Sequence, residues 1–153
     1  RAMLTYRKAT IPQCDAFLVL LREKTGGYLE PTLRVMGMTW DEFAEMVRTV
    51  GEVRAILRAR TTVGFVWIER RDRTLHVHGV ALEPAFRRQG IGTAVFRDLE
   101  EEFCASVDAI ELGVHESNSR ARALYERLGF HVETALPDVG FRILRKSIGA
   151  SRP

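Results

Sequence analysis

Seven consecutive residues of this chain have the composition of a phosphate-binding turn. They are Arg87, Arg88, Gln89, Gly90, Ile91, Gly92 and Thr93. They follow a strand-like run, residues 75–82, and lead into a helix-like run that begins at their glycines. In such a turn several backbone N–H groups converge on an anion, and the helix dipole adds partial positive charge. A glycine places no Cβ in the way. The segment therefore predicts a phosphorylated ligand, with a purely structural turn as the alternative.

Two histidines precede the turn on the same strand-like run. His76 and His78 alternate with Leu75 and Val77, so we expect both imidazoles on one face and the apolar side chains on the other. An imidazole with a pKa near the usual value of about 6.5 suits a general base at neutral pH. The alternative is a pair of strand histidines that make ordinary hydrogen bonds. Further candidates for a base are Glu83, Glu111 and His115.

The first three elements expected are a strand over residues 4–9, a helix over 11–23 and a second helix that stops at Gly51. Thr39 and Glu42 have the T-x-x-E spacing of a capping box and predict the start of that second helix. The first helix has one apolar face, formed by Cys14, Phe17, Leu18 and Leu21 at helical spacing. Residues 26–38 contain Gly and Pro without a clear period, so we expect a loop there.

The remaining elements suggest a sheet with a crossover. Alternating apolar residues predict strands over 53–58, 62–69, 75–82, 109–114, 131–135 and 141–148, and helical stripes predict helices over 90–105 and 118–128. The first three strands read as an antiparallel meander. A strand–helix–strand unit of the length of residues 75–114 implies a right-handed crossover and parallel pairing. The order β-α-α-β-β-β-α-β-α-β-β predicts an α+β or mixed α/β fold, as a single domain over residues 3–149.

Composition narrows the classes of partner. The chain has 153 residues, of which 46% are hydrophobic and 28% charged, and no apolar run approaches the ~20 residues of a membrane span. The formal net charge is +3, and the arginines are scattered and interrupted by acidic runs, so neither nucleic acid nor a membrane is expected as partner. No signal peptide is recognised. Arg1 and Ala2, which precede Met3, are left out of the fold.

The two cysteines, Cys14 and Cys104, lie far apart and have no metal-type spacing. We therefore interpret both as small core or surface residues and expect no metal. A reducing cytoplasm is the natural setting for such a chain.

Residues beyond the turn make its motif more specific. Residues 87–92 read R-x-x-G-x-G, which is neither the P-loop nor the dinucleotide-binding pattern. Together with Asn118, Leu124-Tyr125 and Gly129-Phe130, in this order of elements, the motif resembles the Gcn5-related N-acetyltransferase (GNAT) superfamily. The resemblance covers nearly the whole chain, although the N-terminal half matches in pattern only. That family permits Gln or Arg at the first motif position, here Arg87.

The resemblance implies acetyl-coenzyme A (acetyl-CoA) as the donor of an acetyl group. The pyrophosphate would rest on the backbone N–H groups of residues 87–93. The pantetheine would pair with the preceding strand at Val80, Ala81 and Leu82, where the neighbouring parallel strand splays away. Asn118 matches a position that commonly hydrogen-bonds the cofactor. The implied fold is a mostly antiparallel twisted sheet with one splayed parallel pair, flanked by helices.

Tyr125 permits two interpretations. It shares a helical stripe with Ala121, Leu124 and Leu128, which is typical of a core tyrosine. Within the family it would be a general acid for the leaving thiolate. A phenol has a pKa of about 10 and a thiol about 8.5, so the proton transfer is uphill by only about 2 kcal/mol. His76 matches the position of a glutamate base in some members, and the change to histidine leaves its role open.

The function implied is N-acetylation of an amine on a small molecule, peptide or protein. No cysteine is placed to carry the acetyl group, which favours direct transfer in a ternary complex. Residues 26–38, the first two helices and the last hairpin are expected to contact the acceptor. A non-catalytic acyl-CoA sensor of the same fold is the alternative, and an arginine-rich nucleic-acid binder is a third. The acceptor, the acyl preference and the oligomeric state, including a homodimer, stay open.

Overall fold

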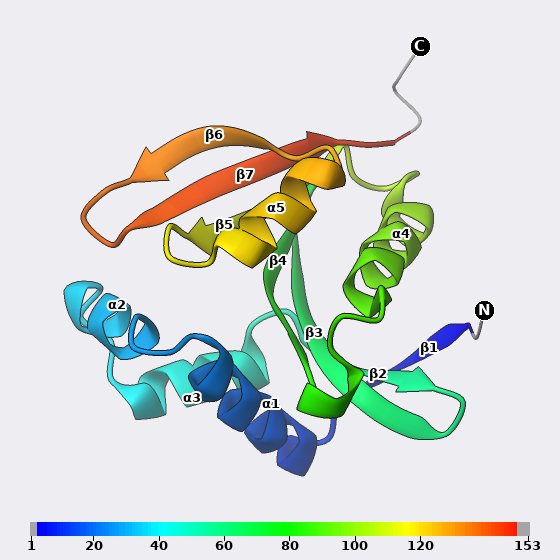
Figure 1. Cartoon of the computed structure of the whole chain (residues 1–153), viewed down its shortest axis with the longest axis horizontal. Coiled ribbons are helices and arrows are strands. Elements are labelled where there is room, and N and C mark those ends of the chain that lie inside the picture. Colours follow the sequence, from blue (N-terminus) through cyan, green and yellow to red (C-terminus); the bar gives the residue numbers. More distant parts are fainter. Residues whose placement is uncertain (1–2, 150–153) are drawn as a thin grey trace. The chain divides into compact units, whose positions relative to one another are not determined.

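A computed structural model describes residues 3–149, so Arg1 and Ala2, set aside above, lie outside the described residues. The elements, shown in Figure 1, are β1 (Leu4–Lys8), α1 (Ile11–Lys24), α2 (Leu29–Val35), α3 (Trp40–Thr49), β2 (Glu52–Arg58), β3 (Thr61–Arg71), β4 (Thr74–Leu82), a 3₁₀ turn (Pro84–Phe86), α4 (Ile91–Phe103), β5 (Ala109–His115), α5 (Ser119–Arg127), β6 (His131–Leu136) and β7 (Phe141–Ser147).

The strands are hydrogen-bonded in the order β1-β2-β3-β4-β5-β7-β6. The pair β4–β5 is parallel, whereas β1–β2, β2–β3, β5–β7 and β6–β7 are antiparallel. The mixed α/β class and the parallel pair expected from the sequence are thereby confirmed. The parallel register runs from Thr74–Ala109 to Val77–Leu112 and ends inside both strands, as a splayed pair requires.

The chain packs as two compact units. The first comprises residues 3–69 and Gly79–Ile91, and the second comprises Arg70–His78 and residues 92–149. The strand β4 takes part in both, because its first half lies in the second unit and its second half in the first. The assignment of residues 3–149 to one domain stays a prediction.

The core of the first unit is built from α1 and α3, which lie side by side (Figure 1), and from the inner face of β2 and β3. Phe17 of α1 is fully buried, and its ring centroid lies 5.9 Å from that of Phe65 and 6.4 Å from that of Trp67. The predicted capping box is confirmed: Glu42 N–H donates to Thr39 Oγ1 at 3.1 Å, and Thr39 N–H donates to Glu42 Oε1 at 2.9 Å. These bonds lower the pKa of the Glu42 carboxyl.

The expectation of a loop over residues 26–38 is wrong, because α2 forms within it. Seven residues make barely two turns, too few for a periodic apolar stripe to stand out in the sequence. Leu33 is 4% exposed, and the Thr32 hydroxyl donates to the Tyr28 carbonyl at 2.7 Å. Packing of α2 against α3 therefore supplies what the local sequence does not signal.

The second unit places α4 and α5 against one another. On α4, Val95, Phe96 and Leu99 are buried, whereas Phe103 is half-buried. The Glu100 carboxylate binds Lys146 of β7 at 2.7 Å, with both side chains largely buried.

One glycine controls how closely β3 and β4 approach. A Cβ at Gly64 would lie 2.4 Å from the Ala81 carbonyl oxygen and 2.8 Å from Leu82 Cδ2. We expect Gly64→Ala to lower the free energy of unfolding by about 1–3 kcal/mol, because backbone rather than a flexible side chain must move. Urea denaturation measures the change. Gly27→Ala is the control, since a Cβ there meets nothing within 4 Å. Equal loss in both variants would contradict the close approach.

Candidate functional site

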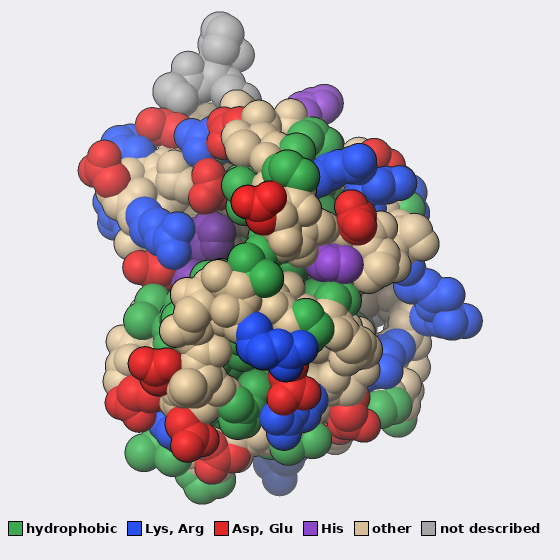
Figure 2. Space-filling model, turned by 90° about the vertical axis from the view of Figure 1, so that its left-hand side faces the viewer, with side chains coloured by type: hydrophobic (Ala, Val, Ile, Leu, Met, Phe, Trp, Pro, Cys, Tyr) green, Lys and Arg blue, Asp and Glu red, His purple; other side chains and the backbone are tan. Residues whose placement is uncertain are grey.

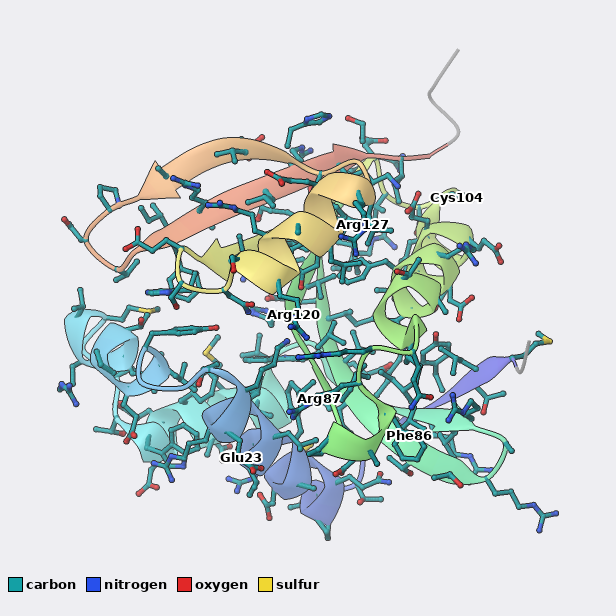
Figure 3. The ribbon with its side chains drawn as sticks, in the orientation of Figure 1. Glu23, Phe86, Arg87, Cys104, Arg120 and Arg127 are labelled. Atoms are coloured by element: carbon teal, nitrogen blue, oxygen red, sulfur yellow. The ribbon has the colours of Figure 1, made fainter. Side chains whose placement is uncertain are left out.

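The segment between β4 and α4 forms an exposed turn that is suited to an anion. Phe86 and Arg87 lie in it (Figure 3), and residues 87–90 are exposed. Arg88 and Gly90 have φ angles of +63° and +79°. Turns with left-handed residues of this kind bring successive N–H groups into an anion-binding concavity. The helix α4 begins directly after the turn, and the first N–H groups of a helix have no partner within that helix.

The turn is held by side chains from its own unit. Arg58 of β2 donates to Gln89 Oε1 at 3.0 Å, and Gln89 Nε2 donates to the Ala85 carbonyl at 3.0 Å. The Arg58 guanidinium also lies 5.2 Å from the centre of the Phe86 ring. The backbone donors of the turn are therefore positioned before any anion arrives.

The last residues of β4 present one backbone edge away from β3. The Ala81 carbonyl faces Gly64 of β3, and Glu83 N–H donates to the Val63 carbonyl at 2.8 Å. Because backbone groups alternate between the two edges of a strand, the Val80 and Leu82 carbonyls point to the opposite edge. The Val80 and Ala81 side chains are buried, so only backbone is offered there.

Two cations hold these outward carbonyls. Lys24 Nζ, at the end of α1, donates to the Val80 carbonyl, and Arg87 Nε donates to the Leu82 carbonyl at 3.0 Å. The pKa of Lys24 is lowered to about 8, first by removal of its ammonium from water and second by the charge of Arg87. The Lys24 residue as a whole is exposed, so we assign the desolvation to the ammonium end, where Nζ meets the strand.

In the second unit, His76 is paired with a carboxylate. His76 Nδ1 lies 3.0 Å from Glu111 Oε1, and the two side chains are 14% and 22% exposed. A carboxylate accepts hydrogen bonds, so Nδ1 carries the proton of the neutral imidazole and Nε2 carries the lone pair. Arg145 lies 3.9 Å from the other Glu111 oxygen. The ring of His78 is 4.5 Å from that of His76, which confirms that both share one face.

His115 has the opposite tautomer. The Ser117 N–H donates to His115 Nδ1 at 3.2 Å, so the neutral ring carries its proton on Nε2. Of these two histidines, only His76 has its Nε2 lone pair oriented by a carboxylate. His76 is therefore the better candidate for a base.

Tyr125 belongs to an aromatic cluster. It is 9% exposed, and its ring centroid lies 5.5 Å from that of Phe96 and 5.7 Å from that of Phe130. Leu124 beside it reaches Gly92: a Cβ at that glycine would lie 3.5 Å from Leu124 Cδ2. The helix that carries Tyr125 thus packs on the first turn of α4. This fits a core tyrosine, and its role as an acid stays a prediction.

Asn118 has a structural task that the sequence analysis did not assign. It is the N-cap of α5, where its Oδ1 accepts from Ala121 N–H at 3.2 Å. The side-chain amide nitrogen is not used by this cap, and contact with a cofactor stays a prediction. Burial raises the pKa of the Cys14 thiol, whereas Cys104, labelled in Figure 3, is exposed.

Each unit therefore gathers part of the predicted set. The first holds residues 80–82 and most of the turn, and it adds Lys24, which the sequence analysis missed. Only tertiary contact reveals Lys24, because Val80 is 56 residues away in sequence. The second unit holds Gly92, Thr93, His76, His78, Glu111, Asn118 and Tyr125.

Three general features bear on partners. Figure 2 shows Lys and Arg side chains interspersed with Asp and Glu over the visible face, as expected from the scattered arginines. No helix among the described residues is long and apolar enough to cross a membrane. Within residues 3–149 no group of three or more His, Cys, Asp or Glu side chains could hold a metal ion, and metal-independent chemistry stays a prediction.

Solved structures of acetyltransferases share this fold. The PaiA N-acetyltransferase of Thermoplasma acidophilum, in complex with coenzyme A, has a TM-score of 0.63 at 18% identity, covering 94% of this chain and 98% of that chain. The ribosomal-protein-S18-alanine N-acetyltransferase of Escherichia coli has a TM-score of 0.67 at 21% identity, covering 98% of this chain and 97% of that chain. A spermidine N-acetyltransferase SpeG chimera from Vibrio cholerae and hSSAT has a TM-score of 0.72 at 19% identity, covering 95% of this chain and 96% of that chain.

Sequence comparison identifies the family. A mycothiol acetyltransferase of Brachybacterium faecium is 35% identical over 85 residues, which are 50% of this chain and 25% of that protein. This chain thus matches about a quarter of the length of that curated relative. The acetyltransferase (GNAT) family matches residues 20–130, a segment that contains the strand, the turn, Asn118 and Tyr125. The chain belongs to the GNAT family of acetyltransferases.

Proposed function

We propose that this protein transfers an acetyl group from acetyl-CoA to an amine, directly and within a ternary complex. The observation that carries the proposal is the continuous run of an outward strand edge, a turn with left-handed residues and a helix start, at residues 80–93. The pyrophosphate would bind the N–H groups of the turn. The pantetheine amides would hydrogen-bond the outward carbonyls of β4. The thioester supplied by acetyl-CoA would then lie toward Val80, at the end of the edge that is remote from the turn.

The chain supplies a base on the same strand. His78 and His76 precede Val80 on β4 by two and four residues. His76, oriented by Glu111, would accept the proton of the acceptor amine through water. His78 is the second candidate for this role, because its ring lies 4.5 Å from that of His76.

Tyr125 would return a proton to the departing thiolate. Its phenol stands on a helix that packs against the first turn of α4, and its ring is fixed by Phe96 and Phe130.

Transfer without an acetylated enzyme is supported by Cys14, whose burial and raised pKa make it a poor nucleophile.

The acceptor is an amine of a small molecule, a peptide or a protein. The names of the relatives given above mention mycothiol, spermidine and an alanine of ribosomal protein S18, so they include both small molecules and a protein. The activity is tested by thiol release from acetyl-CoA with a panel of such amines. If acetyl-CoA binds but no amine in the panel causes release of thiol, the result would favour the non-catalytic acyl-CoA sensor.

The turn can be tested with a charge of the wrong sign. We expect Gly90→Asp to abolish binding of acetyl-CoA, because a carboxylate would face the pyrophosphate. Calorimetric titration measures the affinity. Gly37→Asp is a matched control, since Gly37 has a φ of +73° against +79° for Gly90 and a Cβ at either meets nothing within 4 Å. Retained affinity in Gly90→Asp would make the turn purely structural.

The base can be tested by pH dependence. We expect His76→Ala to slow acetyl transfer about 10²-fold at neutral pH and to remove the acid limb of the pH–rate profile. His131→Ala, at an exposed position on β6, is the control. Glu111→Ala should move the His76 proton from Nδ1 to Nε2, which nitrogen NMR detects. An unaltered pH–rate profile in His76→Ala would exclude the role.

The acid can be tested without disturbing the aromatic cluster. We expect Tyr125→Phe to lower turnover by about 10²-fold while the affinity for acetyl-CoA changes little, because only the hydroxyl is lost. Steady-state kinetics and calorimetry separate the two effects, with Tyr6→Phe on β1 as control. Unchanged turnover would return Tyr125 to a purely structural role.

A further inference from the structure

Lys24 is an amine of this chain that touches the proposed donor strand. Its ammonium donates to the Val80 carbonyl from the end of α1, and the neighbouring outward carbonyl, of Leu82, is held by Arg87. Both contacts lie within the first unit. The same edge is where the proposed function places the pantetheine, so Lys24 stands at its thioester end.

The Lys24 amine also has a larger neutral fraction than the amine of an ordinary lysine. With a pKa of about 8, about a tenth of it is neutral at pH 7, against roughly one in 10³ or fewer for an ordinary lysine. The charged group that faces it is Arg87, from the turn after β4. Only the neutral amine has the lone pair that attacks a thioester.

We propose that Lys24 is a self-acetylation site of this protein, an inference that rests on the proposed binding of acetyl-CoA along β4. The Lys24 nitrogen forms a bond to the acetyl carbonyl carbon, and the carbon–sulfur bond breaks. Coenzyme A leaves as the thiolate and takes the proton that the nitrogen loses. The products are an amide at Lys24 and free coenzyme A, and no oxidant or further reactant is needed.

The other two lysines provide internal comparisons. The chain contains Lys8, Lys24 and Lys146. Lys8 is exposed on β1 and represents chemical acetylation from solution. Lys146 Nζ lies 2.7 Å from Glu100 Oε2, so this ion pair engages its amine. Acetylation that followed exposure alone would therefore favour Lys8.

The experiment incubates the full chain with acetyl-CoA and no added amine, and follows each lysine by peptide mass spectrometry. We expect one acetyl group on Lys24, at a rate at least about tenfold above that of Lys8, because its neutral fraction is higher and its donor is bound. Excess coenzyme A, which lacks the acetyl group, should suppress the reaction at Lys24 and leave Lys8 unaffected. Lys24→Arg should remove this product from the intact mass, and Lys8→Arg should not.

Calorimetry with acetyl-CoA distinguishes the two ways of failing. Binding without acetylation of Lys24 would overturn the self-acetylation and leave the proposed function intact. Acetylation of Lys24 no faster than that of Lys8, or insensitive to coenzyme A, would also overturn it, because the reaction would be chemical. Absence of binding would overturn the proposed function and this inference together.

Discussion

The end of parallel pairing inside β4 and β5, at Val77 and Leu112, is the constraint on which the candidate site depends. A strand within a complete sheet has no backbone groups to offer, because neighbours on both sides use them. Beyond Val77, the odd-numbered residues of β4 still face β3, whereas the Val80 and Leu82 carbonyls point the other way. A sheet edge of this kind is a ready template for an extended ligand.

Such an edge needs partners when no ligand is present, because backbone carbonyls shielded from water are almost always hydrogen-bonded. Here the partners are the ammonium of Lys24 and the guanidinium of Arg87. Side chains can be displaced, unlike a neighbouring strand. The carbonyls of this edge are thus hydrogen-bonded, yet a ligand can replace their side-chain partners. The charge of Arg87 beside Lys24 also contributes to the lowered pKa of Lys24.

The same strand carries different chemistry on its two halves. Alternation places Leu75 and Val77 in the core and His76 and His78 on the opposite face, and Glu111 of β5 fixes the tautomer of His76. The proposed donor edge and the proposed base therefore lie on the two halves of one strand, β4. Tyr125 is held differently, by aromatic packing around Phe96, so its position depends on the seam between α4 and α5.

Local patterns in the sequence determined most elements, the capping box at Thr39, the glycine turn, and the shared face of His76 and His78, because each depends on neighbours within a few residues. Tertiary structure alone decided the rest. The helix α2 forms through packing of Leu33, although its seven residues carry no readable period. The partners Glu111 and Lys24 lie 35 and 56 residues from His76 and Val80, respectively. No local pattern encodes which distant side chain meets a given strand, since pairing register and helix packing set those distances.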